Sequence, residues 1–588
     1  MDSKHVTEST SGQEDIQKTW WKEAIIYQIY PRSFQDSDGD GIGDLNGITS
    51  RLDYIQSLGV DIIWLNPIFL SPNDDNGYDI SDYREIMREF GTMEDFDRLL
   101  KEIHKREMRL VLDLVVNHTS DEHPWFEEAR KSRHNPYYNY YHWWPAEKGE
   151  PPLRLSYFDE EGNAWMYNKP TDSYYLHYFS RKQPDLNWEN PEIRQEIFDM
   201  MRFWFDKGID GFRMDSISLI AKDPSFPLID SKKYPDIFSF YAKEPRLHLY
   251  LHEMNRQVLS KYDCMSVGEG SAVMVDDVAK FVDPAREELN MLYHFDAARI
   301  RNTTLPDNPE SGIDYSLIAL KKMFTEWDKA IDKGWPSIYL GNHDQPRMVS
   351  RFGSDKDEFR ALSAKMLITF LLTMRGTPYW LAGDEIGMRN IRFDRIEDYN
   401  DIDTINRYKK AKAEGKDPQA VLDEQKETGR DNARTPFQWD RSPEAGFTAG
   451  TPWLKVNPDY TWINVADEEK DPTSILNYFK KVVSFRKENP SLIYGSYHLL
   501  DAENPQCYIF LRKTGADTYL IMLNFSPKAA ISTPGIDMSN AHVLLDNYGD
   551  RSHMAPQKDI TLRPFEAIVF QLNHPVYESF IDSLDLLE

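Results

Sequence analysis

The chain has 588 residues and a formal net charge of −28 at pH 7, and 13% of its residues are aromatic. Its length predicts two or three domains, and its negative charge argues against nucleic acid or an anionic membrane surface as a partner. The chain has only two cysteines, which predicts a reducing compartment and no disulfide framework. Residues 1–17 have no apolar stretch that would predict a signal peptide, and no run of about eighteen apolar residues predicts a membrane span. We therefore expect a cytoplasmic protein. Residues 1–17 are polar and are expected to be disordered, and nothing in the sequence indicates the oligomeric state.

An acidic loop, residues 36–44, follows a predicted buried strand at 24–30. It reads Asp-Ser-Asp-Gly-Asp-Gly-Ile-Gly-Asp, with carboxylates at alternate positions and glycines that permit a tight wrap. Oxygen ligands in this arrangement suit Ca²⁺, with the carbonyl of Ile42 as a backbone ligand by analogy with helix–loop–helix calcium sites. An acidic turn without metal is the alternative. We expect a structural ion, because nothing in the loop leaves a site for chemistry.

Strands and helices alternate after this loop, with helices expected over 47–58 and 93–106. Seven further apolar strands are predicted, at 61–67, 110–118, 211–215, 265–269, 291–295, 337–344 and 378–383. This alternation predicts a parallel sheet, and eight strands with helices between them predict an α/β fold of the (β/α)₈ TIM-barrel type. Every polar cluster falls at the carboxyl end of a strand, where such barrels have their active sites.

Three segments depart from the regular alternation. The connection 118–187 is long and rich in Tyr, Trp and Pro, which predicts an inserted domain beside the site. A second excursion over 388–440 carries a Lys- and Glu-rich helix at 404–415, and the last barrel helix is expected at 472–488. The barrel therefore comprises 18–117 and 188–490. Short alternating runs follow and predict a C-terminal antiparallel β-sandwich domain over 491–588.

The strand at 211–215 ends in a cation and an acid. Arg213 and Asp215 are two residues apart, so their side chains share one face of the strand. A fixed cation keeps a neighbouring carboxylate ionised, as a nucleophile for glycosyl transfer requires; an ordinary salt bridge is the alternative. Glu269 has glycines and Val267 around it and no cation nearby in the sequence, so it can keep its proton and act as an acid.

These motifs resemble the α-amylase superfamily, glycoside hydrolase family thirteen, and specifically its branch of oligo-1,6-glucosidases, α-glucosidases and sucrose isomerases. The matching stretches, in the order of that family, are 113–118, 211–215, the strand that ends at Glu269, and 342–344. Gln183–Asn187 matches a marker of the branch, and 75–80 and 430–440 strengthen the likeness. The resemblance extends from about residue 20 to the C-terminus.

The resemblance implies a role for each matching residue. Asp215 would be the nucleophile, Glu269 the general acid/base and Asp344 the third carboxylate. The terminal glucosyl unit would be bound by Asp75, Tyr78, His118, Phe179, Arg213 and His343. Arg434 would be the cation that pairs with Asp75 and closes this subsite, with Arg430 as the alternative. Calcium would be held by Asp36, Asp38, Asp40, Ile42 and Asp44, and no organic cofactor is implied.

The implied activity is that of a retaining exo-acting α-glucosidase on short oligosaccharides or disaccharides. The linkage stays open between α-1,4, α-1,6 and sucrose, because Ser216 follows the nucleophile where the branch has Val for α-1,6 and Thr or Ala for α-1,4. Arg299 and Arg301 loosely resemble the Arg-rich loop of sucrose isomerases, so isomerase or transglucosylase activity is an alternative; a solvated basic loop is the favoured interpretation. A non-catalytic sugar-binding homologue is a distant alternative, since such relatives usually lose the carboxylates.

Overall fold

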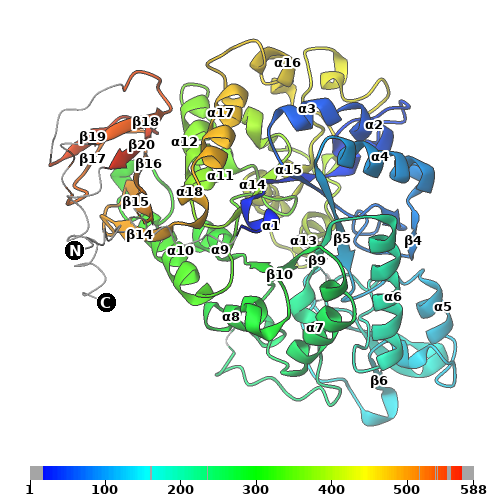
Figure 1. Cartoon of the computed structure of the whole chain (residues 1–588). Coiled ribbons are helices and arrows are strands. Elements are labelled where there is room, and N and C mark those ends of the chain that lie inside the picture. Colours follow the sequence, from blue (N-terminus) through cyan, green and yellow to red (C-terminus); the bar gives the residue numbers. More distant parts are fainter. Residues whose placement is uncertain are drawn as a thin grey trace, which may run out of the picture.

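The computed structural model describes residues 18–572, except 159–161, 235, 516, 537, 539–540 and 552–557. The segment expected to be disordered, 1–17, lies outside the described residues, as does the end of the predicted C-terminal domain. Figure 1 shows a barrel ringed by helices, with a smaller β domain on one side. Within the described residues, no helix has the length and apolar character needed to cross a membrane.

Eight parallel strands form the barrel, as the sequence predicts. They are β1 (Ile26–Ile29), β2 (Ile62–Leu65), β5 (Arg109–Val115), β9 (Gly211–Asp215), β10 (Met265–Glu269), β11 (Met291–Tyr293), β12 (Ser337–Ile338) and β13 (Thr377–Leu381). Their hydrogen-bonded order is β11-β10-β9-β5-β2-β1-β13-β12. The ends meet where Ser337 Oγ donates to the carbonyl of Leu292 at 3.0 Å. Several strands are shorter than predicted; β12, for example, covers only the first two residues of the predicted strand at 337–344.

Helices surround the barrel, and those predicted at 93–106 and 472–488 lie close to their predicted positions. They include α4 (Met93–Lys105), α6 (Pro191–Lys207), α7 (Arg246–Gln257), α8 (Val278–Val282), α10 (Leu317–Ile331), α12 (Arg360–Thr373) and α17 (Ile475–Glu488). The helix expected over 47–58 is two helices, α2 (Leu45–Ser50) and α3 (Leu52–Ser57), because Arg51 leaves helical geometry with φ −107° and ψ 7°. Helix α17 begins after Ser474, whose side chain accepts from the Asn477 amide as an N-cap.

The two long connections cover one end of the barrel. The first contains α5 (Pro124–Ala129) and a sheet of β6 (Trp143–Pro145), β8 (Ser173–Leu176) and β7 (Trp165–Asn168). The second contains α13 (Ile402–Ala413), α14 (Pro418–Thr428) and α15 (Asp431–Arg434), of which only the first was expected. Asn406 Nδ2 in α13 donates to the Phe158 carbonyl at 2.7 Å and thereby joins the two connections.

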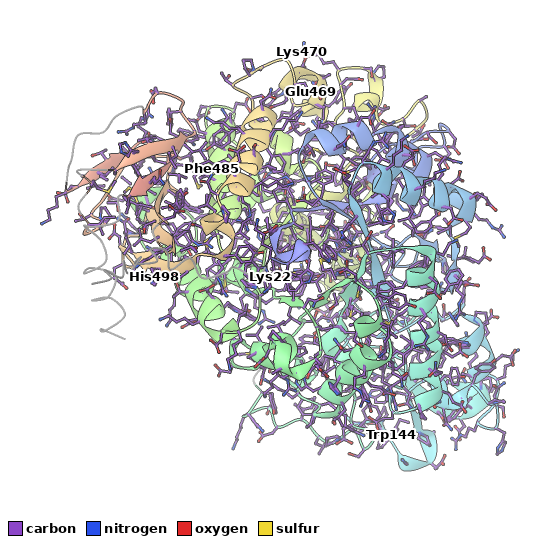
Figure 2. The ribbon with its side chains drawn as sticks, viewed as in Figure 1. Lys22, Trp144, Glu469, Lys470, Phe485 and His498 are labelled. Atoms are coloured by element: carbon purple, nitrogen blue, oxygen red, sulfur yellow. The ribbon has the colours of Figure 1, made fainter. Side chains whose placement is uncertain are left out.

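The C-terminal part is antiparallel, as expected. One sheet contains β14 (Ser496–Leu500), β15 (Cys507–Thr514), β16 (Asp517–Asn524), β20 (Ala567–Leu572) and β18 (His542–Asp546), and the other pairs β17 (Ala530–Ser532) with β19 (Ile560–Leu562). Figure 2 shows His498 of β14 and Trp144 of β6 in well-separated parts of the molecule. The domain boundaries themselves, including 118–187 and 491–588, stay predictions.

Two buried arginines join this domain to the barrel. Arg486 in α17 donates to the carbonyls of Leu372, Met374, Gly376 and Leu492. Arg512 in β15 donates to the carbonyls of Thr373, Leu492, Ile493 and Gly495. These contacts satisfy carbonyls at the carboxyl ends of α12 and of α18 (Ser491–Tyr494), where the last carbonyls of a helix have no partner within it.

Candidate active site

Arg213 lies at the centre of the carboxyl end of the barrel, with its side chain fully buried. Its Nη1 donates to Asp113 Oδ1 at 2.7 Å and to Asp215 Oδ1 at 2.8 Å. Its Nη2 donates to Glu269 Oε2. One cation therefore contacts three acids, from β5, β9 and β10. The sequence near Glu269 has no cation, but the barrel brings Arg213 to it from the neighbouring strand.

Asp215 and Glu269, which both contact this guanidinium, have different pKa values. Burial raises the pKa of Asp215 to about 6, although Arg213 opposes the shift. Burial, opposed by Arg213, raises the pKa of Glu269 to about 8, and the charges of Asp215 and Asp344 add to this increase. A hydrogen bond between the two carboxyls acts in opposite directions on them, lowering the pKa of Asp215 and raising that of Glu269. At pH 7 Asp215 is mostly ionised and Glu269 mostly protonated.

The backbone turns sharply directly after Asp215. Ser216 adopts the left-handed region with φ 42° and ψ 31°, which is uncommon for a residue other than glycine. This turn brings the Ser216 amide 3.3 Å from Glu269 Oε2, to which it donates. On the other side, Ser271 Oγ donates to Glu269 Oε1 at 2.9 Å. Both oxygens of Glu269 are therefore held in place.

A small pocket of about 330 Å³ opens onto these acids. Its walls come from the ends of β9 and β10, from the loops after β2, β5 and β12, and from both long connections. It is lined by Asp75, Tyr78, His118, Phe158, Phe179, Asp215, Ser216, Glu269, His343, Asp344 and Arg430. Carboxylates, neutral rings and one guanidinium around a narrow space suit a polyhydroxylated ligand, which presents hydrogen-bonding edges and apolar faces.

Both histidines of the pocket are neutral donors. Burial lowers the pKa of His118 and of His343 to about 3. Gln28 Nε2 donates to His343 Nδ1 at 2.8 Å, so the other ring nitrogen carries the proton. That nitrogen lies 2.7 Å from the Tyr78 hydroxyl and 3.1 Å from Asp344 Oδ2. The histidine thus orients the carboxylate of Asp344 toward the pocket.

Two arginines of the excursion contact the same carboxylate. Arg430 Nη1 lies 3.2 Å and Arg434 Nη2 lies 3.0 Å from Asp344 Oδ1. Burial alone would raise the pKa of Asp344, but His343 and these two arginines hold it well below its usual range. Asp344 is therefore ionised throughout the neutral range.

Asp75 pairs with Arg430, and the expected pairing with Arg434 is corrected. Arg430 Nη2 lies 3.5 Å from Asp75 Oδ1, and the guanidinium covers the Phe158 ring at 4.8 Å. Arg434 is four residues further along, at the end of α15, and its Nε donates to the carbonyl of His343 at 2.9 Å. Burial raises the pKa of Asp75 to about 7, against the influence of both arginines. Arg430 is the cation at the pocket wall.

Known proteins resemble the whole of this architecture. A model of the α-amylase catalytic domain matches residues 28–495. Oligo-1,6-glucosidase of Parageobacillus thermoglucosidasius is 51% identical over 571 residues, covering 95% of this chain and 100% of the relative. The chain belongs to the α-amylase family of glycoside hydrolases.

Other members of this family are also similar to the chain. Trehalose-6-phosphate hydrolase of Bacillus subtilis (strain 168) is 43% identical, covering 95% of this chain and 99% of the relative. The crystal structure of trehalulose synthase MutB from Pseudomonas mesoacidophila MX-45 aligns with a TM-score of 0.89 and 43% identity, covering 94% of this chain and 99% of that one. Relatives with different names thus share one fold and similar length.

Arg299 and Arg301, which were predicted as substrate-binding residues, do not line the pocket. Arg299 and Arg301 belong to a helix, α9 (Asp296–Thr303), and not to a loop. Arg299 pairs with Asp296 at 3.4 Å on the surface, and Arg301 Nη2 pairs with Asp314 at 2.6 Å. Both therefore have partners away from the acids.

Sequence reasoning missed Phe158. It lies next to Phe179, with ring centroids 5.5 Å apart, and Phe179 in turn lies 5.1 Å from the ring of His118. The inserted segment carries many aromatic residues, so composition alone singles out none of them. The only available signal was that this segment was expected beside the site.

The acidic loop at 36–44 brings together three of the residues predicted to bind calcium. Carboxylate oxygens of Asp36, Asp38 and Asp40 lie within 4.8 Å of one another. Burial and the neighbouring acids raise the pKa of Asp40, against a hydrogen bond from the Ile42 amide. Asp44 lies outside this group, because its carboxylate caps α2 through the Gly47 amide at 2.7 Å. The Asp36 carboxylate also accepts from the amides of Asp38, Gly39 and Gly41, so the loop folds around it. An all-oxygen set of three carboxylates fits a hard cation such as Ca²⁺.

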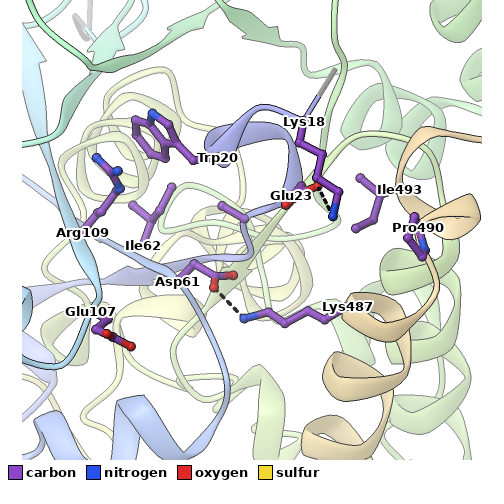
Figure 3. Close-up of a pocket in the computed structure, with 11 residues that line it drawn as sticks. Lys18, Trp20, Glu23, Asp61, Ile62, Glu107, Arg109, Lys487, Pro490 and Ile493 are labelled. Carbon is purple, nitrogen blue, oxygen red and sulfur yellow. Dashed lines mark hydrogen bonds and ion pairs between the residues drawn. The ribbon is translucent and has the colours of Figure 1, made fainter. Parts of the chain in front are cut away.

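A second cavity, of about 860 Å³, lies at the amino end of the barrel strands. Figure 3 shows Trp20 and Arg109 on one side of it and the ion pair of Asp61 with Lys487 on another. The Arg109 guanidinium stacks on the Trp20 ring at 3.9 Å. Barrel enzymes have their active sites at the opposite end, and these contacts tie α1 (Trp20–Glu23) and α17 to the strands.

Proposed function

We propose that the chain is a retaining, exo-acting α-glucosidase that removes terminal α-linked glucose from short oligosaccharides or disaccharides. One observation carries this proposal: Asp215 and Glu269 share the guanidinium of Arg213 in a small pocket, yet have pKa values of about 6 and about 8. An ionised and a protonated carboxyl side by side are the pair that double displacement requires.

In the first step, an Asp215 oxygen attacks the anomeric carbon while Glu269 gives its proton to the glycosidic oxygen, and the bond to the leaving sugar breaks. In the second step, the ionised Glu269 takes a proton from water, whose oxygen displaces Asp215 and restores both groups. Two inversions give net retention. The hydrogen bond between the two carboxyls supports this course, because inverting enzymes separate them by about 6.5–9.5 Å.

The remaining pocket residues would hold the glucosyl unit. Asp344 is ionised and offers its oxygens to ring hydroxyls, whose hydrogen bonds strengthen as charge develops at the anomeric carbon. Besides Asp344, we assign binding roles to Tyr78, His118, Phe179, Arg213 and His343. The pair of Asp75 with Arg430 forms the closed wall beyond the terminal sugar, which supports exo-action.

We propose α-1,6 linkages as the preferred substrate. The oligo-1,6-glucosidases of Parageobacillus thermoglucosidasius and Bacillus cereus are 51% and 49% identical to the chain, which supports this choice where Ser216 leaves it open. Sucrose isomerisation is the second candidate, because trehalulose synthase MutB has the same architecture. The position of Arg299 on an exposed helix surface favours the hydrolase.

Two further assignments accompany this function. We propose that Asp36, Asp38 and Asp40 bind a structural Ca²⁺, with the Ile42 carbonyl completing the set, and that Asp44 acts as a helix cap beside it. We also propose a cytoplasmic location, which the two free cysteines support.

The test is a substrate panel of isomaltose, maltose, sucrose and trehalose, with products separated by chromatography. The wild type should release glucose from isomaltose most rapidly, and Asp215→Asn should be inert on all four sugars. A new disaccharide from sucrose would support the isomerase instead. No turnover by the wild type, or equal turnover by Asp215→Asn, would contradict the proposal.

A further inference from the structure

The hydrogen bonds of Arg213 account for every donor that this side chain has. A guanidinium carries five N–H groups. One donates to Asp113, one to Asp215 and one to Glu269. The other two, on Nε and Nη2, both donate to the hydroxyl oxygen of Tyr293, the Nε contact at 2.9 Å. Tyr293 therefore receives as many donors from Arg213 as Asp215 and Glu269 together.

The register of the barrel strands places the Tyr293 side chain on the same side of the sheet as Glu269. Tyr293 is the last residue of β11 and pairs in register with Glu269 of β10. Residues in register on neighbouring parallel strands point to the same side of the sheet, so both side chains enter the barrel interior. The Tyr293 ring is held edge-on by Tyr339 at 5.4 Å and by Phe295 at 5.9 Å, and the residue is only 4% exposed. Its hydroxyl is thus fixed by packing.

We propose that Tyr293 is a positioning residue that limits Glu269 to a single hydrogen bond from Arg213 and so keeps Glu269 the acid that carries the proton. This inference rests on the proposed function. Without the Tyr293 oxygen, two N–H groups of a buried guanidinium lose their acceptor, which is costly unless they find another. Glu269 Oε2 is the acidic acceptor that Nη2 already contacts. A second donor stabilises the ionised form and removes the proton that the first step needs.

The removal of only this oxygen tests the proposal. Tyr293→Phe keeps the ring and its packing, so the kcat/KM for isomaltose should retain the acidic limb of its pH profile. The basic limb should move to lower pH by about one to two units, the usual effect of a closer opposite charge on a carboxyl. Tyr293→His, which keeps a ring and one acceptor nitrogen, should move it less in the same direction. It provides the same test if the phenylalanine variant folds poorly.

A matched control is Tyr339→Phe. Tyr339 contacts the Tyr293 ring, but its hydroxyl donates to the carbonyl of His294 and not to Arg213. This variant should leave both limbs in place. The proposal would be overturned if the basic limb of the pH profile did not move in Tyr293→Phe and Tyr293→His. It would also be overturned if Tyr339→Phe shifted this limb as far as Tyr293→Phe does.

A second comparison separates this proposal from the assignment of the acid. An activated aryl α-glucoside needs little proton donation, so Glu269→Gln should spare its cleavage far more than that of isomaltose. If it does, Glu269 is the acid, and an unmoved basic limb in the Tyr293 variants overturns only the positioning role. If Glu269→Gln affects both substrates equally, the acid assignment fails, and the role of Tyr293 fails with it.

Discussion

Replacement of Arg430 by methionine removes the cation from the closed end of the pocket. The Arg430 side chain contacts Asp344 at 3.2 Å, Asp75 at 3.5 Å and Asp401 through Nε at 2.7 Å. Methionine fills a similar volume without charge. We therefore expect the catalytic acids to remain in place while the terminal subsite loses the group that orients two of its carboxylates.

The size of the loss follows from these contacts. A hydrogen bond to a charged group contributes about 1.5–3 kcal/mol, and the two pocket contacts are long, so together they contribute about 2–4 kcal/mol. Since about 1.4 kcal/mol corresponds to a factor of ten, kcat/KM should fall by about 30-fold to about 10³-fold. The loss of Arg430 also raises the pKa of Asp75 further, so this carboxyl becomes protonated at neutral pH.

The assay is the hydrolysis of isomaltose at neutral pH, with folding checked by thermal denaturation. Arg395→Met is the matched control, because Arg395 lies on the same excursion with two thirds of its side chain exposed (66%) and, within the described part of the chain, its ion pairs are with Glu397 and Asp398, both near it in the sequence. Its kcat/KM should stay within about twofold of the wild type. A folded Arg430→Met with wild-type kcat/KM, or an equal loss in Arg395→Met, would refute the role of Arg430 in the pocket wall.

Three further outcomes are expected. First, a plot of kcat/KM against pH should be bell-shaped, rising near pH 6 as Asp215 ionises and falling near pH 8 as Glu269 loses its proton. A plot that is flat through this range contradicts these assignments. Second, chelation, or Asp38→Asn, should lower Tm in calorimetry without moving either limb, and an unchanged Tm argues against a bound ion. Third, Arg486→Met should lower the unfolding free energy in urea by about 3–5 kcal/mol, because four buried carbonyls lose a charged donor; a loss below about 1 kcal/mol contradicts this.

The barrel and the position of its site were accessible from sequence. Strands and helices alternate at regular spacing, and parallel strands bring their carboxyl ends to one rim. Residues as distant as Asp75, Asp215 and Asp344 therefore had to meet, whatever their separation along the chain. The motifs of the family then assigned a role to each of them.

The details that failed depend on contacts between segments. The sequence around Glu269 offers no cation, but Arg213, 56 positions earlier, reaches it across neighbouring strands. Arg430 and Arg434 lie one helical turn apart, and only the path of the excursion decides which one meets Asp75. Phe158 had no distinguishing pattern at all. Spacing predicts which face a residue occupies, but not which partner a long side chain selects.

The most direct test of the double-displacement mechanism is to trap its covalent intermediate. A fluorinated α-glucosyl fluoride, which slows the second step, is incubated with the wild type, and the protein is digested and analysed by mass spectrometry. The mechanism predicts one glucosyl adduct, on the peptide that contains Asp215, and none in Asp215→Asn. An adduct on Glu269 or Asp344, or hydrolysis of the reagent with inversion and no adduct, would contradict the assignment of Asp215 as the nucleophile.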